Sequence, residues 1–82
     1  MARKYLHKRR PPEGFGERLR EAVYDSGYNT NELERLSGVN HSNISQYMSE
    51  DMAPSAWTLA SLCMVLKVSA DYLLFGGKKC NM

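Results

Sequence analysis

The sequence predicts an all-α protein, a compact bundle of five short helices, and three observations support this fold class. Apolar residues recur at helical spacings of three and four residues, and no stretch alternates with the period of two that strands require. Asn or Ser, which cap helix N-termini well, precedes most of these stretches, and glycine follows several of them. The length of 82 residues leaves room for one domain with a modest core.

The first predicted helix begins at Phe15, because Pro11 and Pro12 before it favour an extended path. Gly27 is a natural stop for this helix. Its predicted buried face consists of Phe15, Leu19, Ala22 and Val23. On its outer surface we expect ion pairs of Arg18 with Glu21 and of Arg20 with Glu17.

The second predicted helix follows Asn29, which has Glu32 three residues later, the spacing of a capping box. It is expected to bury Leu33 and Leu36 and to end at Ser37-Gly38.

The third predicted helix is capped by Asn40 and has an unusual outer surface. At 100° per residue, its apolar face is formed by Ile44, Tyr47 and Met48. The other positions are small or uncharged polar residues: Ser42, Gln46 and Ser49 opposite the apolar face, His41 and Ser45 on one flank, and Asn43 on the other. Such side chains suit a partner that offers many hydrogen-bond donors and acceptors.

Two further helices complete the predicted bundle after a loop at residues 49–54. Ser55 caps the fourth, and Trp57 near its start is expected to cover one end of the core. Ser69 begins the fifth, which stops at Gly76-Gly77. The predicted apolar stripe of the fourth helix is Leu59, Leu62, Cys63 and Leu66.

The charge distribution divides the chain into an arm (1–13), a helical domain (14–77) and a tail (78–82). The formal net charge is +2, but the first ten residues hold five cations and no acid, whereas the remainder holds six basic and nine acidic residues. A basic arm is typical of nucleic-acid tethers, and a merely solubilising disordered terminus is the alternative. The cations of the arm are Arg3, Lys4, Lys8, Arg9 and Arg10.

Several protein classes are disfavoured by the sequence. No apolar run approaches the roughly 20 residues of a membrane span, and the N-terminus lacks the apolar segment of a secretory signal. The two cysteines, Cys63 and Cys80, imply no disulfide framework, so we expect a reducing, cytoplasmic location. The two histidines, His7 and His41, have no Cys or carboxylate at metal-ligand spacing, and no nucleophile stands beside a base. The prediction is a protein without metal, cofactor or catalytic activity.

The second and third helices are joined by a turn at residues 37–40 that contains Gly38, which is the pattern of a helix-turn-helix. In this motif the second helix enters the DNA major groove. From Phe15 to Gly76 the chain resembles the phage-repressor and Cro-like (Xre) family. The resemblance is carried by this motif together with the segments FGERLREA, LERLSGVNHSNISQY, APSAWTLASLCMVLKV and SADYLLFG.

The resemblance implies the lambda-repressor-like five-helix fold and sequence-specific binding of double-stranded DNA, as a homodimer on a near-palindromic operator. It implies base-reading roles for His41, Ser42 and Gln46, with Asn43 a further polar contact. Contacts to the DNA backbone are implied for Asn29 and Thr30, and are expected for Ser45 and the five arm cations. The last helix is implied to form the dimer contact through Tyr72, Leu74 and Phe75. The 82 residues leave no room for the C-terminal dimerisation and self-cleavage domain of larger phage repressors, so we expect a minimal Cro-like regulator or a truncated one.

Two residues and one segment depart from the family pattern. Thr30 stands where glutamine is usual, Glu34 where a small residue is usual, and the segment SEDM (49–52) where a glycine with basic neighbours is usual. If the loop of Glu50 and Asp51 approached DNA as in relatives, its carboxylates would repel the phosphates. The acidic helical domain therefore keeps one alternative open, a helix-turn-helix module or antirepressor that binds another regulator.

Overall fold

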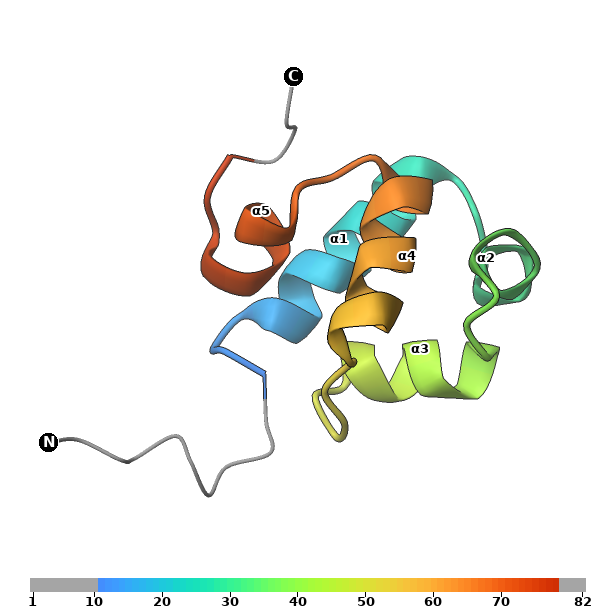
Figure 1. Ribbon diagram of the computed structural model, residues 1–82, viewed down its shortest axis with the longest axis horizontal. Coiled ribbons are helices and arrows are strands. Elements are labelled where there is room, and N and C mark those ends of the chain that lie inside the picture. The colour runs from blue at the N-terminus through green and yellow to red at the C-terminus, as the bar shows by residue number, and fades with distance from the viewer. Residues whose placement is uncertain (1–10, 79–82) are drawn as a thin grey trace, which may run out of the picture.

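The computed structural model describes residues 11–78, which form five α-helices and no strand (Figure 1). The helices are α1 (Phe15–Ser26), α2 (Thr30–Ser37), α3 (His41–Met48), α4 (Ala56–Leu66) and α5 (Ala70–Phe75). The predicted all-α fold with five helices is confirmed. The arm cations lie outside the described residues.

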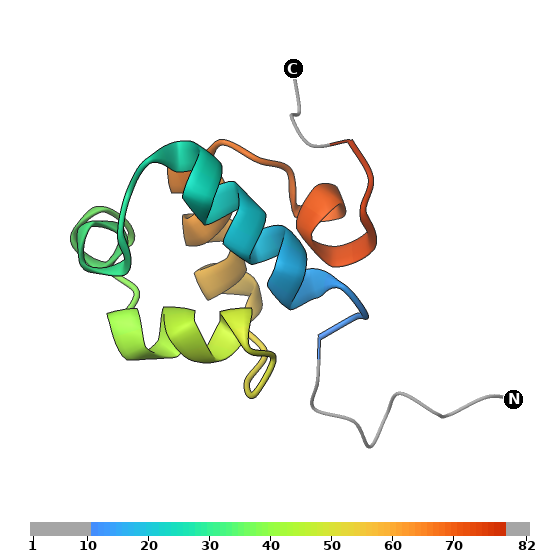
Figure 2. The same ribbon diagram turned by 180° about the vertical axis from the view of Figure 1, so that it is seen from behind.

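The helices pack around α1, which contacts α3, α4 and α5, while α2 contacts α3 and α4. In Figures 1 and 2, α3 runs along the lower edge of the molecule, and α5 lies against α1 on the side away from α2. None of the helices that the structure describes is long and apolar enough to cross a membrane. The buried core consists of Phe15, Leu19, Ala22, Val23, Leu33, Val39, Ile44, Tyr47, Leu62, Leu66, Tyr72 and Leu73.

The predicted helix ends are confirmed by their capping contacts. Asn29 and Glu32 form a complete capping box, in which each side chain accepts a hydrogen bond from the other's backbone N–H. Asn40, Ser55 and Ser69 also accept from backbone N–H groups in the first turns of their helices. These short helices thus begin where local side chains satisfy backbone donors that the helix leaves free.

The two arginines of α1 bind backbone carbonyls, so the predicted ion pairs with Glu21 and Glu17 are wrong. Arg18 donates to the carbonyls of Leu73 and Leu74 at 3.1 and 3.0 Å, at the C-terminal end of α5. Arg20 donates to the carbonyl of Met48 at 2.8 Å, at the end of α3. Carbonyls at helix C-termini lack intrahelical partners and carry partial negative charge, which favours a guanidinium there.

Two apolar side chains predicted to be buried are exposed. Leu36 is 51% exposed, because α2 is only two turns long and directs Leu33 into the core. Trp57 is 83% exposed, because Leu62 and Leu66 fix the rotation of α4 and Trp57 lies 180° from Leu66 on the helical wheel. The other predicted members of the α4 stripe, Leu59 and Cys63, are half-buried against the core.

Candidate nucleic-acid interface

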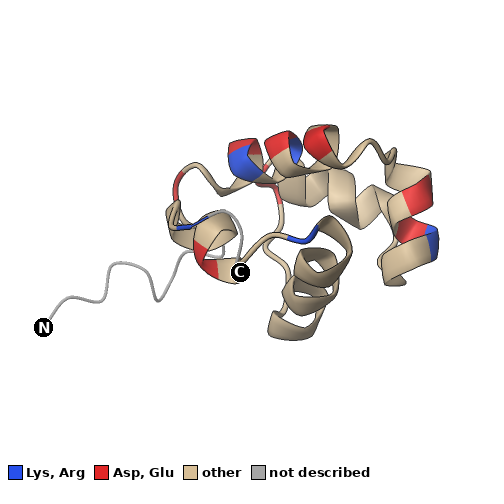
Figure 3. Ribbon diagram, turned by 90° about the horizontal axis from the view of Figure 1, so that it is seen from above, with Lys and Arg blue, Asp and Glu red and all other residues tan. Residues whose placement is uncertain are grey.

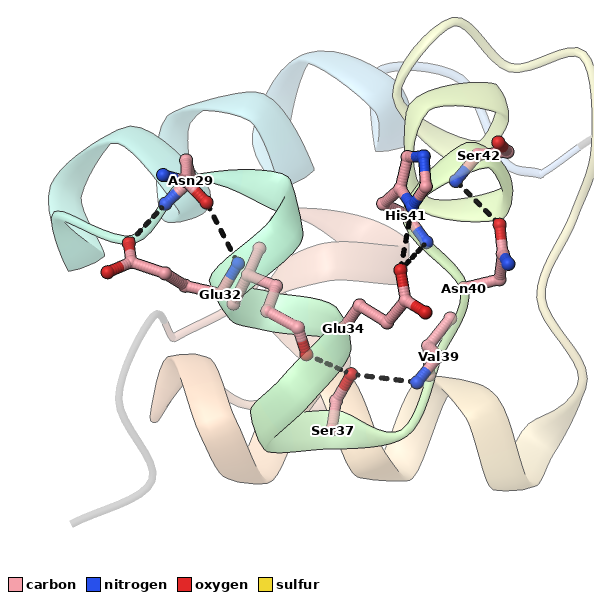
Figure 4. Close-up of polar contacts among 9 residues, drawn as sticks. Asn29, Glu32, Glu34, Ser37, Val39, Asn40, His41 and Ser42 are labelled. Atoms are coloured by element: carbon pink, nitrogen blue, oxygen red, sulfur yellow. Dashed lines mark hydrogen bonds and ion pairs between the residues drawn. The ribbon is translucent and has the colours of Figure 1, made fainter.

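The helix-turn-helix is built by a turn that fixes α3 to the end of α2. The Ser37 hydroxyl donates to the carbonyl of Leu33 at 2.6 Å and accepts from the N–H of Val39 at 3.1 Å (Figure 4). Gly38 has φ of 80°, a conformation that costs a residue with a Cβ considerable strain. Val39 is buried and anchors the turn in the core. In Figure 1 α2 is seen nearly end-on while α3 runs across the view, so the two helices are not parallel.

One face of α3 holds the helix in the core and leaves the opposite face to solvent. Ile44 is fully buried and Tyr47 is 5% exposed, while Met48 packs partly against the core. The predicted apolar face is therefore confirmed. The predicted polar positions His41, Ser42, Ser45, Gln46 and Ser49 are exposed, and Asn43 is half-buried.

The first turn of α2 lies at the other end of the motif and contains the predicted backbone contacts Asn29 and Thr30. The capping box engages the side-chain oxygen of Asn29, which leaves its amide nitrogen as the atom that could meet an anion. Thr30 is half-buried at the first position of the helix. A helix N-terminus favours phosphate through its free N–H groups and its dipole.

A contact that the sequence analysis did not anticipate joins α2 to the start of α3. One carboxylate oxygen of Glu34 lies 2.7 Å from Nδ1 of His41 and accepts the His41 backbone N–H at 3.1 Å (Figure 4). These hydrogen bonds lower the pKa of the Glu34 carboxyl from its ordinary value of 4.5. The signal in the sequence was the departure itself, a carboxylate where the family usually has a small residue.

The loop after α3 directs its first carboxylate into the protein. Glu50 has φ of 65° and accepts the backbone N–H of Gly16, in the first turn of α1, at 2.8 Å. Gly16 is buried, and a Cβ at this position would overlap the Met48 carbonyl and lie 2.8 Å from Cγ of Glu50. Asp51 is exposed and accepts from the Ser49 hydroxyl at 3.0 Å. Glu50, one of the two acids that would lie near phosphates, is thus bound to α1.

The charged residues of the helices lie outside α3. All nine acidic residues of the chain lie in residues 11–78, together with five basic residues, and neither α3 nor α4 contains a charged residue (Figure 3). The body is therefore acidic on α1 and α2 but uncharged along α3. A polyanion that approaches α3 meets neutral donors and acceptors there, with the carboxylate of Glu34 at one end and that of Asp51 just beyond the other.

The residues predicted for the dimer contact differ in exposure. Tyr72 is 9% exposed, and its hydroxyl donates to Glu21 at 2.9 Å, which ties α5 to α1. Leu74 is half-buried against the core, whereas Phe75 is 73% exposed. Phe75 is therefore the side chain of α5 that has the most surface to offer a partner.

The structure describes no arrangement suited to metal binding within residues 11–78, where no three His, Cys, Asp or Glu side chains cluster. Cys63 is a free thiol, and burial raises its pKa, which favours the protonated form.

Comparison with known proteins identifies relatives among bacterial and phage regulators. The HTH-type transcriptional regulator ImmR of Bacillus subtilis (strain 168) is 36% identical over 60 residues, which are 73% of this chain and 47% of ImmR. The chain thus spans about half the length of this curated relative. No family model matches the sequence.

Two solved structures share both fold and sequence with this chain. The crystal structure of the P22 c2 repressor protein in complex with synthetic operator 9T is 32% identical, with a TM-score of 0.72, and covers 76% of this chain and 94% of that one. The solution structure of the P22 c2 repressor DNA-binding domain is 31% identical, also with a TM-score of 0.72, and covers 79% and 86%. This chain therefore belongs to the phage-repressor family of helix-turn-helix DNA-binding domains.

Proposed function

We propose that the chain is a sequence-specific transcriptional regulator, a repressor, that reads the major groove of double-stranded DNA with α3. The observation that carries the proposal is the exposed, uncharged polar face of α3 in a domain similar to an operator-bound repressor. Small polar side chains let a helix lie deep in the groove, which long charged side chains on the same face would obstruct.

The proposed contacts divide into base-reading and backbone positions. Gln46 projects from the middle of the exposed face, and its amide can pair with both major-groove groups of adenine. Ser42 is expected to discriminate less strictly between bases, because a hydroxyl can both donate and accept a hydrogen bond. His41 and Asn43 are the other proposed base contacts, and Ser45, Asn29 and Thr30 are the proposed backbone contacts.

The arm is proposed to supply the positive charge that the helical body lacks. If Arg3, Lys4, Lys8, Arg9 and Arg10 each neutralise a phosphate, they contribute about 4–5 units to the slope of log K against log salt concentration. Deletion of residues 2–10 should flatten that slope and weaken binding to all sequences alike. An unchanged slope would show that the arm takes no part.

The regulator is proposed to bind as a homodimer through α5, with Phe75 at the contact. Paired α3 helices would then read half-sites about 34 Å apart in a near-palindrome. A footprint on a single half-site would contradict this arrangement. The contact is small, so we expect dimerisation to be strong on DNA and weak in free solution.

The test of the proposal is a base-by-base affinity profile at fixed salt for wild type, Gln46→Ala and Met64→Ala. Gln46→Ala should cost about 1–3 kcal/mol on the best operator and relax the preference at one base pair per half-site. Met64 is a matched control, because it is similar in size, uncharged and 77% exposed on α4. Its profile should equal that of wild type.

One outcome would favour a different function. If wild type and Gln46→Ala give the same profile, α3 does not read bases. The acidic body would then support the alternative, a module or antirepressor that binds another regulator.

A further inference from the structure

The contact between Glu34 and His41 constrains the chemistry of the imidazole as well as its position. A single carboxylate oxygen, Oε1 of Glu34, meets both the backbone N–H and Nδ1 of His41 (Figure 4). The distance of 2.7 Å to Nδ1 lies at the short end of the range for charge-assisted hydrogen bonds. The imidazole is thus held from the side of α2, at the first residue of the helix proposed to read DNA.

The carboxylate decides which ring nitrogen carries the proton. Because the pKa of Glu34 is lowered, its carboxyl is ionised at neutral pH and can only accept hydrogen bonds. Nδ1 of His41 must therefore be the donor. In the neutral imidazole the other nitrogen, Nε2, then has no proton and is an acceptor.

Nε2 is also the ring nitrogen that remains for a ligand. The side chain of His41 is 49% exposed, and within residues 11–78 its ring is hydrogen-bonded through Nδ1. While its imidazole is neutral, His41 therefore presents an acceptor at the leading end of α3. Without Glu34, nothing within residues 11–78 would hold the proton on Nδ1, and His41 could present a donor through Nε2.

We propose that Glu34 is a positioning residue that fixes His41 as an acceptor, so that His41 selects a base with an exocyclic amine, adenine or cytosine, over guanine. The proposal rests on the proposed function, in which α3 reads the major groove. There the N6 amine of adenine and the N4 amine of cytosine donate, whereas guanine offers the acceptors N7 and O6. As an acceptor, Nε2 can accept a hydrogen bond from either amine. Opposite guanine, its lone pair would face the lone pair of N7 or O6, which is repulsive.

The first test measures the tautomer in the protein without DNA. Nitrogen-15 NMR of the imidazole at pH 8 should place the His41 proton on Nδ1 in wild type and mainly on Nε2 in Glu34→Ala. The chain has two histidines, so His7→Gln assigns the signals. A proton on Nε2 of His41 in wild type would overturn the proposal, whatever the protein binds.

The second test measures base preference at the pair that His41 contacts, identified as the position where His41→Ala flattens the profile. Wild type should favour adenine or cytosine over guanine by about tenfold, in the range of a single good base contact. Glu34→Ala should reduce this ratio to about threefold or less and leave the preference at the Gln46 position intact. Equal ratios in the two proteins would overturn the proposal.

A charge control separates this effect from simple electrostatics. Removal of any carboxylate near phosphates should raise affinity for all sequences. Asp51→Asn removes an exposed carboxylate just beyond the other end of α3 and leaves His41 untouched, so it should raise affinity without changing the ratio. If Asp51→Asn changes the ratio as Glu34→Ala does, the selection is not due to the tautomer. If no variant binds DNA, the proposed function fails and base selection fails with it, whereas the tautomer measurement is unaffected.

Discussion

At the N-terminal end of α3 a carboxylate faces solvent and binds the first residue of that helix, whereas beyond its C-terminal end a carboxylate turns inward and binds a different helix. Glu34 is 42% exposed and meets His41, the first residue of the proposed reading face. Glu50 is half-buried and accepts the N–H of Gly16 in α1. Both residues depart from the family pattern, and both add negative charge to a domain proposed to bind DNA. The comparison shows that an acidic residue must be judged by the donor it satisfies, since one carboxylate holds the first residue of the proposed reading face and the other joins α1 to the end of α3.

The largest expected effect concerns the C-terminal end of α3, where α1 approaches the last carbonyl of that helix. Gly16→Ala should reduce the free energy of unfolding by about 3 kcal/mol, because the added Cβ overlaps a backbone carbonyl that cannot move aside like a side chain. Urea unfolding followed by circular dichroism measures this loss.

Gly27→Ala is the control for Gly16→Ala. Nothing lies within 4 Å of a Cβ at Gly27, but its φ of 82° is unfavourable for alanine, so this variant should cost about 1 kcal/mol. If Gly16→Ala costs no more than Gly27→Ala, the close approach of α1 to α3 is looser than the geometry indicates.

A smaller loss is expected for Glu50, and two substitutions separate its hydrogen bond from its backbone conformation. Glu50→Ala loses the bond to Gly16 and keeps the positive φ, so it should cost about 1.5–3 kcal/mol. Glu50→Gly loses the same bond but relieves the strain at φ of 65°, so it should cost about 1 kcal/mol less. Thermal unfolding of the two variants provides the comparison.

Equal stabilities of these Glu50 variants would mean that the loop relaxes to a negative φ when the carboxylate is lost. In either case, base preference should match wild type, in contrast to the effect proposed for Glu34→Ala. A changed preference in Glu50→Gly would contradict the division between the two ends of α3.

The parts of this fold that the sequence predicted are those specified by neighbouring residues. Asn29 with Glu32 three positions on, and Gly38 after Ser37, define helix ends through contacts within one turn. The burial of Ile44 and Tyr47 follows from helical periodicity in the same way. These features need no knowledge of the tertiary arrangement.

The errors concern side chains whose partners are distant in sequence. Arg18 could pair with an acid one turn away, but the C-terminal carbonyls of α5, more than 50 residues on, lie within its reach once the helices pack. The prediction that Trp57 covers one end of the core is wrong, because the rotation of α4 about its axis depends on the helices against which it packs. The contact of Glu34 with His41 lies between these cases. It spans seven residues, but it forms only because the turn at Gly38 brings α3 back beside α2.

The smallest expected effect concerns the stability contributed by Glu34 and its dependence on pH. The pKa of Glu34 is lowered in the folded protein, so the unfolded chain binds more protons at acidic pH. The contribution of Glu34 is therefore fully present above the ordinary value of 4.5 and is lost as the pH falls through the lowered folded value. It should be smaller than the effect of either Glu50 substitution, because solvent screens the exposed carboxylate. Thermal unfolding of wild type and Glu34→Gln from pH 6 to pH 3 should show that wild type is the more stable protein near pH 6. The difference in stability should disappear as the pH approaches 3. A difference that stays constant across this range would show that the folded protein does not favour the ionised carboxyl, which would also remove the reason for a proton on Nδ1 of His41.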